Sequence, residues 1–390
     1  MNGRGAIAVV AGAVLLTCAA VNLQVPLYDL YATNAGAGKG GLTLMFAAYA
    51  ASMLPVLLGL GGLSDRVGRR ACVVAALGGA LVATSLVWAV PTFGTMIVAR
   101  LLHGVAAGLV LGAGTAWLAR LATRPGVAAG VGAAALAAGF GVSPAATGVA
   151  VWDGLVLRPW TYPAMAASLL LWVVPTLLTR DDGGDPAARL VTWPAFPRGA
   201  VVAGLAVALA WAVVGLMLSV VPAALFAEGG PALGRWAGVV LLVANLTGTG
   251  VMLAATGRVG ERAGMIAGLA ALPVVYALLV AGASGVGGVW LLMLGAAATG
   301  GIVNGLLYLA SLGRVVRLGG DAPARAVAGY YLLAYLGMSV PTVGVGFLAD
   351  ALGTAPALWA FGGLVLPAAG ALILAVAGRR AGAYRAGPTP

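Results

Sequence analysis

Long apolar runs alternate with short polar stretches along the whole chain of 390 residues. Each run is close to the ~20 residues that a helix needs to cross the hydrocarbon core of a bilayer. Because the runs are apolar on all sides, they predict helices in lipid rather than amphipathic helices on a soluble core. We expect twelve transmembrane helices, at roughly 6–31, 43–63, 71–91, 95–118, 127–151, 160–179, 199–225, 235–256, 265–284, 289–312, 326–348 and 355–377.

The longest polar stretch lies between the sixth and seventh runs, and it contains three acidic residues and three prolines. It divides the chain into a six-helix bundle at 1–179, a cytoplasmic linker at 180–198, a second six-helix bundle at 199–378 and a cytoplasmic tail at 379–390. The first run, preceded by Arg4, also has features of a signal peptide. Cleavage would leave an odd number of crossings, so we interpret this run as the first span.

Composition excludes a soluble protein, because 62% of the residues are hydrophobic and 8% are charged, against about 45–50% and about 25% in soluble domains. With the N-terminus inside, seventeen basic residues lie on the inner side and three on the outer side, namely Lys39, Arg158 and Arg235. This asymmetry predicts that both termini are cytoplasmic. The net charge of +11 therefore sets topology, and we expect no binding of nucleic acid.

Little of the chain is suited to catalysis or metal binding. The two cysteines, Cys18 and Cys72, lie in apolar runs, the single histidine has no ligand partner at a typical spacing, and no nucleophile lies next to a base. We expect no enzyme, metal site or cofactor, and a monomer in a lipid bilayer. The arginine bias and the abundance of alanine and glycine are typical of a GC-rich bacterial genome, which favours the cytoplasmic (inner) membrane of a bacterium.

Two landmarks recur about half a chain apart. The loop after the second span and the loop after the eighth share one spacing of glycine, acid, arginine and glycine, 196 residues apart: Gly61, Asp65, Arg66 and Gly68, then Gly257, Glu261, Arg262 and Gly264. The prolines of the fifth and eleventh spans, Pro144 and Pro341, are 197 residues apart. Duplicated halves in parallel orientation bind substrates between the halves, near the bilayer midplane.

The first of these loops, which continues into Arg69 and Arg70, resembles the signature loop of the major facilitator superfamily. Twelve spans and a short linker fit the same family, so the resemblance covers the whole chain. It implies two pseudo-symmetric six-helix bundles and a gating role for the loop. In that role Asp65 holds the outward-open state, and Glu261 and Arg262 belong to the weaker second copy. The alternative is that the arginines only anchor the topology.

Arg100 is the only basic residue within a span, where a charge costs about 2.5–3.5 kcal/mol and therefore needs a partner. The spacing of Arg100 and Gly104 resembles a motif that the family links to proton transfer. Asp29, near the outer end of the first span, is the predicted partner. Our hypothesis is that Asp29 carries the proton, Arg100 controls its ionisation and His103, on the same helix face, relays it. The alternative places Asp29 in the headgroup zone and gives Arg100 a packing role.

The fifth span contains Gly141, Pro144 and Gly148, and this segment resembles the glycine–proline motif of proton-coupled antiporters. A proline inside a helix removes one hydrogen bond and kinks the rod, which suits a hinge. Ser143 and Thr147 stand where that motif has glycine. The resemblance is therefore to the twelve-helix drug/proton antiporter-like branch, with a partial match.

Polar and aromatic side chains on the predicted core spans define a candidate cavity that is nearly uncharged. Each of them also has an ordinary alternative, as a helix–helix hydrogen bond or part of the interfacial aromatic belt. The candidates are Asn22, Gln24, Tyr28, Tyr49, Trp211, Asn245, Asn304, Tyr308, Tyr331 and Tyr335.

Together these features favour a secondary active transporter, with efflux of a moderately apolar small molecule or drug against protons. The scarcity of charge favours a neutral or weakly cationic substrate. Two alternatives stay open: proton-linked uptake of a small metabolite, and a membrane receptor or scaffold that transports nothing.

Overall fold

A computed structural model describes residues 3–59, 62–122, 125–154, 156–181, 183–188, 190, 193–225, 236–320 and 323–378. Within these ranges twelve helical segments are long and apolar enough to cross a membrane. Their bounds follow the predicted runs closely: the seventh, predicted at 199–225, is Ala200–Leu225. The all-α fold with twelve spans is therefore confirmed.

The first six crossings form one half of the molecule. They are α1 (Gly3–Asn22) with η1 (Val25–Leu27) and α2 (Tyr28–Asn34), α3 (Gly38–Gly59), α5 (Arg69–Ala89), α6 (Phe93–Leu109) with η2 (Val110–Gly114) and α7 (Thr115–Leu121), α8 (Pro125–Ala150) and α9 (Thr161–Leu178). The short helix α4 (Leu63–Val67) lies in the loop after α3.

The second half contains the remaining six crossings. They are α10 (Ala200–Leu218), α12 (Ala237–Ala255), α13 (Glu261–Ala283), α14 (Gly288–Ala298) with η3 (Thr299–Leu307) and α15 (Tyr308–Leu318), α16 (Pro323–Leu352) and α17 (Thr354–Gly378). We call the side on which α1 begins the terminal face, and the side on which α3 begins the far face.

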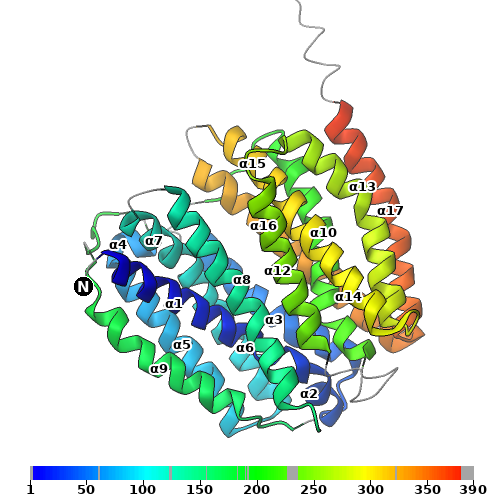
Figure 1. Ribbon diagram of the computed structural model, residues 1–390, viewed down its shortest axis with the longest axis horizontal. Coiled ribbons are helices and arrows are strands. Elements are labelled where there is room, and N and C mark those ends of the chain that lie inside the picture. The colour runs from blue at the N-terminus through cyan, green and yellow to red at the C-terminus, as the bar shows by residue number, and fades with distance from the viewer. Residues whose placement is uncertain are drawn as a thin grey trace, which may run out of the picture.

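The halves meet along two pairs of helices, α8 with α12 and α3 with α16. Figure 1 shows the blue-to-green helices of the first half beside the yellow-green-to-red helices of the second, with α8 and α12 adjacent at the junction. Most of the buried apolar residues of α3, α10, α12 and α16 belong to one continuous core that spans both halves.

The first span is broken. Between α1 and α2 the chain forms a 3₁₀ turn with Pro26 at its start. A proline cannot donate a hydrogen bond to the preceding turn, so carbonyl groups at the end of α1 need other donors. Val21 obtains them from Gln24, with Nε2 at 2.9 Å, and from Arg100 of α6, with Nη1 at 2.7 Å.

The internal repeat has a counterpart in the packing. Gly104 of α6 packs against α3, where a Cβ would collide with Ser52 and the carbonyl oxygen of Tyr49. Gly300, 196 residues later in η3, packs against the carbonyl of Ala244 in α12 in the same way. In both halves, glycine lets the fourth helix of the half touch the backbone of its second helix.

We expect Gly104→Val to lower stability by about 1–3 kcal/mol, because its branched side chain has no space against the α3 backbone. The measurement is the melting temperature of the purified protein. Gly78→Val is the control, since nothing lies within 4 Å of a Cβ at this position in the middle of α5. Equal melting temperatures for the two variants would contradict the packing argument.

Candidate functional site

The halves are in close contact near the far face. A Cβ at Gly238, near the start of α12, would collide with the carbonyl oxygen of Pro144 in α8. Gly141 lies one turn deeper, against Leu242 and Asn245. Near the same end the rings of Trp152 and Trp236 pack edge to face with centroids 5.7 Å apart. The predicted hinge thus faces the other half, with Gly148 also buried in α8.

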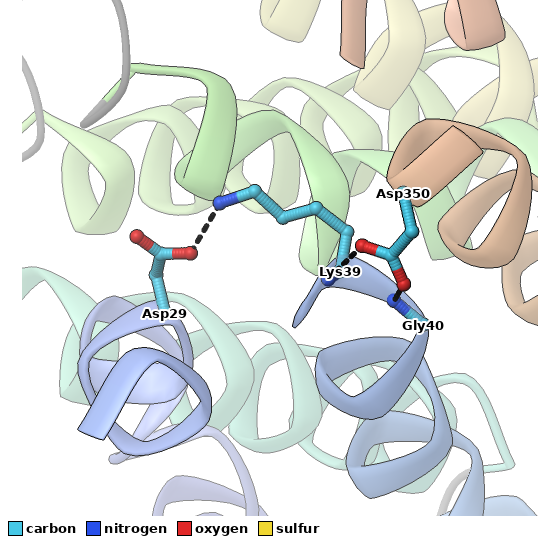
Figure 2. Close-up of polar contacts among 4 residues, drawn as sticks. All are labelled: Asp29, Lys39, Gly40 and Asp350. Carbon is cyan, nitrogen blue, oxygen red and sulfur yellow. Dashed lines mark hydrogen bonds and ion pairs between the residues drawn. The ribbon is translucent and has the colours of Figure 1, made fainter. Parts of the chain in front are cut away.

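A carboxylate joins the other pair of helices at the far face. Asp350, near the end of α16, accepts hydrogen bonds from the backbone N–H groups of Lys39, at 2.6 Å, and Gly40, at 2.8 Å (Figure 2). These groups begin α3, so a side chain of one half caps a helix of the other, where a negative charge is favourable. Asp350 is not among the predicted site residues. Its only signal in the sequence is an acid at the end of an apolar span.

The predicted contact between Asp29 and Arg100 is wrong. The Asp29 carboxylate pairs with the ammonium group of Lys39 at 2.5 Å, and each side chain is about one-fifth exposed. Figure 2 shows the Lys39 side chain extended toward Asp29 and away from Asp350. The cause is the break at Pro26, which separates α2 from α1, so a depth estimated along one straight helix did not apply.

Arg100 is 1% exposed and lies among aromatic rings. Its guanidinium carbon is 4.7 Å from the centroid of the Tyr49 ring, 5.5 Å from that of Tyr28 and 5.9 Å from that of Phe46. Such contacts stabilise a buried cation by about 2 kcal/mol. Nη1 donates to the Val21 carbonyl, whereas the buried Nε has no hydrogen-bond partner within the described chain.

His103 is fully buried beside Arg100 on α6. Its Nδ1 lies 3.4 Å from Nε2 of Gln24, and its Nε2 lies 3.5 Å from the hydroxyl of Thr84. These neighbours are neutral, and Asp29 is not among them, so the predicted three-residue proton relay is not assembled in this structure.

A cavity of about 310 Å³ lies between the halves. Seven of the ten predicted cavity residues line it: Asn22, Tyr49, Trp211, Asn245, Asn304, Tyr308 and Tyr335. Gln24, Tyr28 and Tyr331 are not part of the lining. Tyr28 is buried against Arg100, and Tyr331 exchanges a hydrogen bond with Tyr308 at 2.7 Å between the hydroxyl oxygens.

The second half has an aromatic cluster at this cavity: Trp211, Tyr308 and Tyr335 line it, and Tyr331 packs against them without lining it. The Trp211 ring stacks on that of Tyr308, with the ring centroids 6.2 Å apart, and packs edge to face on that of Tyr335, with the centroids 4.9 Å apart. Across the junction, the Tyr335 ring packs edge to face on the Tyr49 ring of the first half, with the ring centroids 6.5 Å apart. Toward the terminal face the lining continues to Ala133 of α8 and Met252 of α12.

The predicted gating loop is bonded to the linker rather than to the second half in the part of the chain that the structure describes. Asp65 pairs with Arg69 at 3.0 Å, its backbone carbonyl accepts from the N–H of Asp185, and Asp181 accepts from the N–H of Arg70. Gly68 has φ = 94°, which a tight turn at this point requires. Arg66 is exposed, and Gly61 lies outside the described residues.

The second copy of this loop makes its contacts within its own half. Glu261 forms a two-pronged ion pair with Arg317, with a closest distance of 2.6 Å, and Arg262 donates to the carbonyl of Ala377 at 2.7 Å. The linker also contacts the second half, because the backbone N–H of Ala195 donates a hydrogen bond to the carbonyl of Arg325 in α16.

Comparison with protein families gives one match over more than half of the chain: the Major Facilitator Superfamily, at residues 10–224. A search of curated proteins by sequence gives no match.

Solved structures match over nearly the full length. A mutant of the nucleoside transporter NupG has a TM-score of 0.77 at 14% identity, with 96% of this chain and 100% of that chain covered. The human organic anion transporter MFSD10 (TETRAN) has a TM-score of 0.63 at 20% identity, with 95% and 100% covered. A POT family transporter in complex with 5-aminolevulinic acid has a TM-score of 0.76 at 12% identity, with 96% of each chain covered. At these identities the likeness establishes the fold.

Proposed function

This chain belongs to the Major Facilitator Superfamily and is a membrane transporter of that type, and on this premise we propose that it exports a moderately apolar small molecule in exchange for protons. The observation that carries the proposal is the cavity between the two halves, which is largely apolar and lies beneath a sealed far face. Substrates of such transporters bind at this place, between the repeats near the bilayer midplane.

We assign the terminal face to the cytoplasm, because seventeen basic residues lie on that side of the predicted topology and three on the other. The sealed far face is then the outer one, and we infer that this arrangement takes up its substrate from the cytoplasm. Export requires the contacts of Asp350 with α3 and of Gly238 with α8 to break while the terminal ends close. The composition favours the cytoplasmic membrane of a bacterium.

Asp29 is our candidate for the proton carrier, now with Lys39 as its partner instead of Arg100. The pair lies at the far face, where an entering proton arrives first in this orientation. Neutralising the carboxylate ends its attraction to the ammonium group at the start of α3. Since α3 is one of the two helices that seal the far face, the proton would change the same contact that has to open.

The test is transport in proteoliposomes under an imposed pH gradient, with a panel of moderately apolar compounds. We expect movement of compound against protons in the wild type. In Asp29→Asn, the stimulation of compound transport by the pH gradient should fall about tenfold, while the compound still binds. A tenfold change lies within the range that coupling between two sites usually produces. Asp153→Asn is the control, since Asp153 is an exposed carboxylate on the same face.

Each result has a distinct meaning. Stimulation of Asp29→Asn to the wild-type level would refute Asp29 as the carrier. Movement of compound together with protons would replace efflux by uptake. If no compound moves under any gradient, export of moderately apolar compounds is refuted.

A further inference from the structure

The cavity has an uncompensated positive charge. Among its lining residues within the described chain, Arg100 alone is charged. Within the described part of the chain, Asp29 is paired with Lys39, Asp350 caps the start of α3 and Glu261 is paired with Arg317, and none of the carboxylates described there contacts Arg100. A buried cation at this depth is expensive unless it faces a partner. The balance of charge therefore points to an anion brought by the ligand.

Arg100 also has hydrogen-bonding capacity left. A guanidinium group carries five N–H donors, and the structure shows one bond, from Nη1 to the Val21 carbonyl. The three surrounding rings attract the charge through their faces but accept no regular N–H hydrogen bond. The planar fork of remaining donors matches the two oxygens of a carboxylate, and such two-pronged pairs are the strong form of this contact.

The rest of the cavity suits a flat apolar body. Trp211, Tyr308 and Tyr335 present ring surfaces on the side formed by the second half, and Arg100 lies on the side formed by the first. The indole Nε1 of Trp211 is buried and has no hydrogen-bond partner among the described residues, as is the case for Nε of Arg100. Two unpaired donors without a facing carboxylate would disfavour an ammonium ligand.

We propose that the cavity binds an organic monoanion, with its carboxylate on the guanidinium of Arg100 and its aromatic or otherwise apolar body against the rings of Trp211, Tyr308 and Tyr335. This inference rests on the proposed transport function and narrows its substrate to the anions of weak apolar acids. It replaces the expectation of a neutral or weakly cationic substrate, which rested on the scarcity of charge along the chain.

The test compares three probes of one shape: 2-naphthoate, 2-naphthamide and 2-naphthylmethylammonium. Binding to the purified full-length protein at neutral pH is followed by the change in melting temperature and by tryptophan fluorescence. We expect 2-naphthoate to bind at least about tenfold more tightly than the amide, since a hydrogen bond to a charged group is worth about 1.5–3 kcal/mol. The ammonium probe should bind most weakly.

Two variants and a control separate recognition from folding. Arg100→Gln should reduce the naphthoate affinity to that of the amide while leaving amide binding unchanged, which shows that the variant is folded. If that variant does not fold, Arg100→Lys keeps the positive charge but removes the planar fork of donors, and it should reduce the preference for naphthoate at least threefold. Arg258→Gln removes an exposed arginine that lies just after α12 and donates to the carbonyl of Ala254 in that helix, and neither naphthoate nor amide binding should change.

Equal affinity for the three probes, a preference for the ammonium probe, or no binding of 2-naphthoate would overturn the inference. Transport of the same probes in proteoliposomes keeps the two proposals apart. Transport of the neutral or cationic probe alone refutes the anion site and leaves export standing. Binding of 2-naphthoate without transport under any gradient refutes export and leaves the anion site standing.

Discussion

Replacing Gly238 with valine is expected to keep the far face from closing. A side chain at this position meets the backbone carbonyl of Pro144 and the Cα of Ala145 across the junction of α8 and α12. Because the obstacles are backbone atoms, no change of rotamer relieves the collision. Overpacking of this kind costs about 1–3 kcal/mol. The collision exists only when the halves are in contact here, so the variant should shift the conformational equilibrium about 5- to 150-fold toward an open far face.

The measurement is the labelling of one cysteine from the far face. Cys18 and Cys72 are first replaced by alanine, and Thr43, which is fully buried beneath Gly346 of the other half, is replaced by cysteine. A membrane-impermeant maleimide should label this cysteine faster by the same factor when valine occupies position 238. Transport should fall in parallel, because a transporter that cannot seal one face cannot complete its cycle.

Gly250→Val provides the matched control. Gly250 lies on the same helix, and nothing lies within 4 Å of a Cβ built there. The Gly250→Val substitution therefore adds the same side chain to α12 without contacting the other half. If both valine variants label and transport like the parent protein, the contact between Gly238 and Pro144 does not hold the far face closed.

The spans could be predicted closely because their signal is local. A bilayer requires about twenty apolar residues in succession, and the polar stretches between runs mark both ends. Most of the cavity was accessible for a related reason: polar side chains such as Asn245 and Asn304 are costly toward lipid, so they face the protein interior. Interior position alone does not distinguish the lining from residues behind it, and Tyr331 is bonded behind Tyr308.

The partners of the charged residues could not be obtained in this way. Pairing Asp29 with Arg100 required the first span to be straight, whereas Pro26 interrupts it and α2 brings Asp29 to Lys39, ten residues along the chain. Pro26 and the single lysine were both visible in the sequence. The role of Asp350 is different, since it depends on how the two halves dock. No local pattern connects residue 350 with the start of a helix some 310 residues earlier.

Removal of the Asp350 carboxylate should weaken the far-face closure in a second, independent way. In Asp350→Ala the N–H groups of Lys39 and Gly40 lose their acceptor from the other half and turn to water. Loss of such a cap costs typically about 1 kcal/mol, which corresponds to a shift of about fivefold toward an open far face. The same cysteine at position 43 should label faster by that factor. Asp350→Asn keeps one acceptor oxygen and should show a smaller change.

The control is Asp153→Ala, which removes an exposed carboxylate from the same face. This comparison separates the cap from a general loss of negative charge. The cap and the glycine contact lie on different helix pairs, so their effects on labelling should multiply when Asp350→Ala and Gly238→Val are combined. A double variant that labels no faster than Gly238→Val alone would mean that the α8–α12 contact by itself sets the closure of the far face, and that Asp350 caps α3 without contributing to the gate.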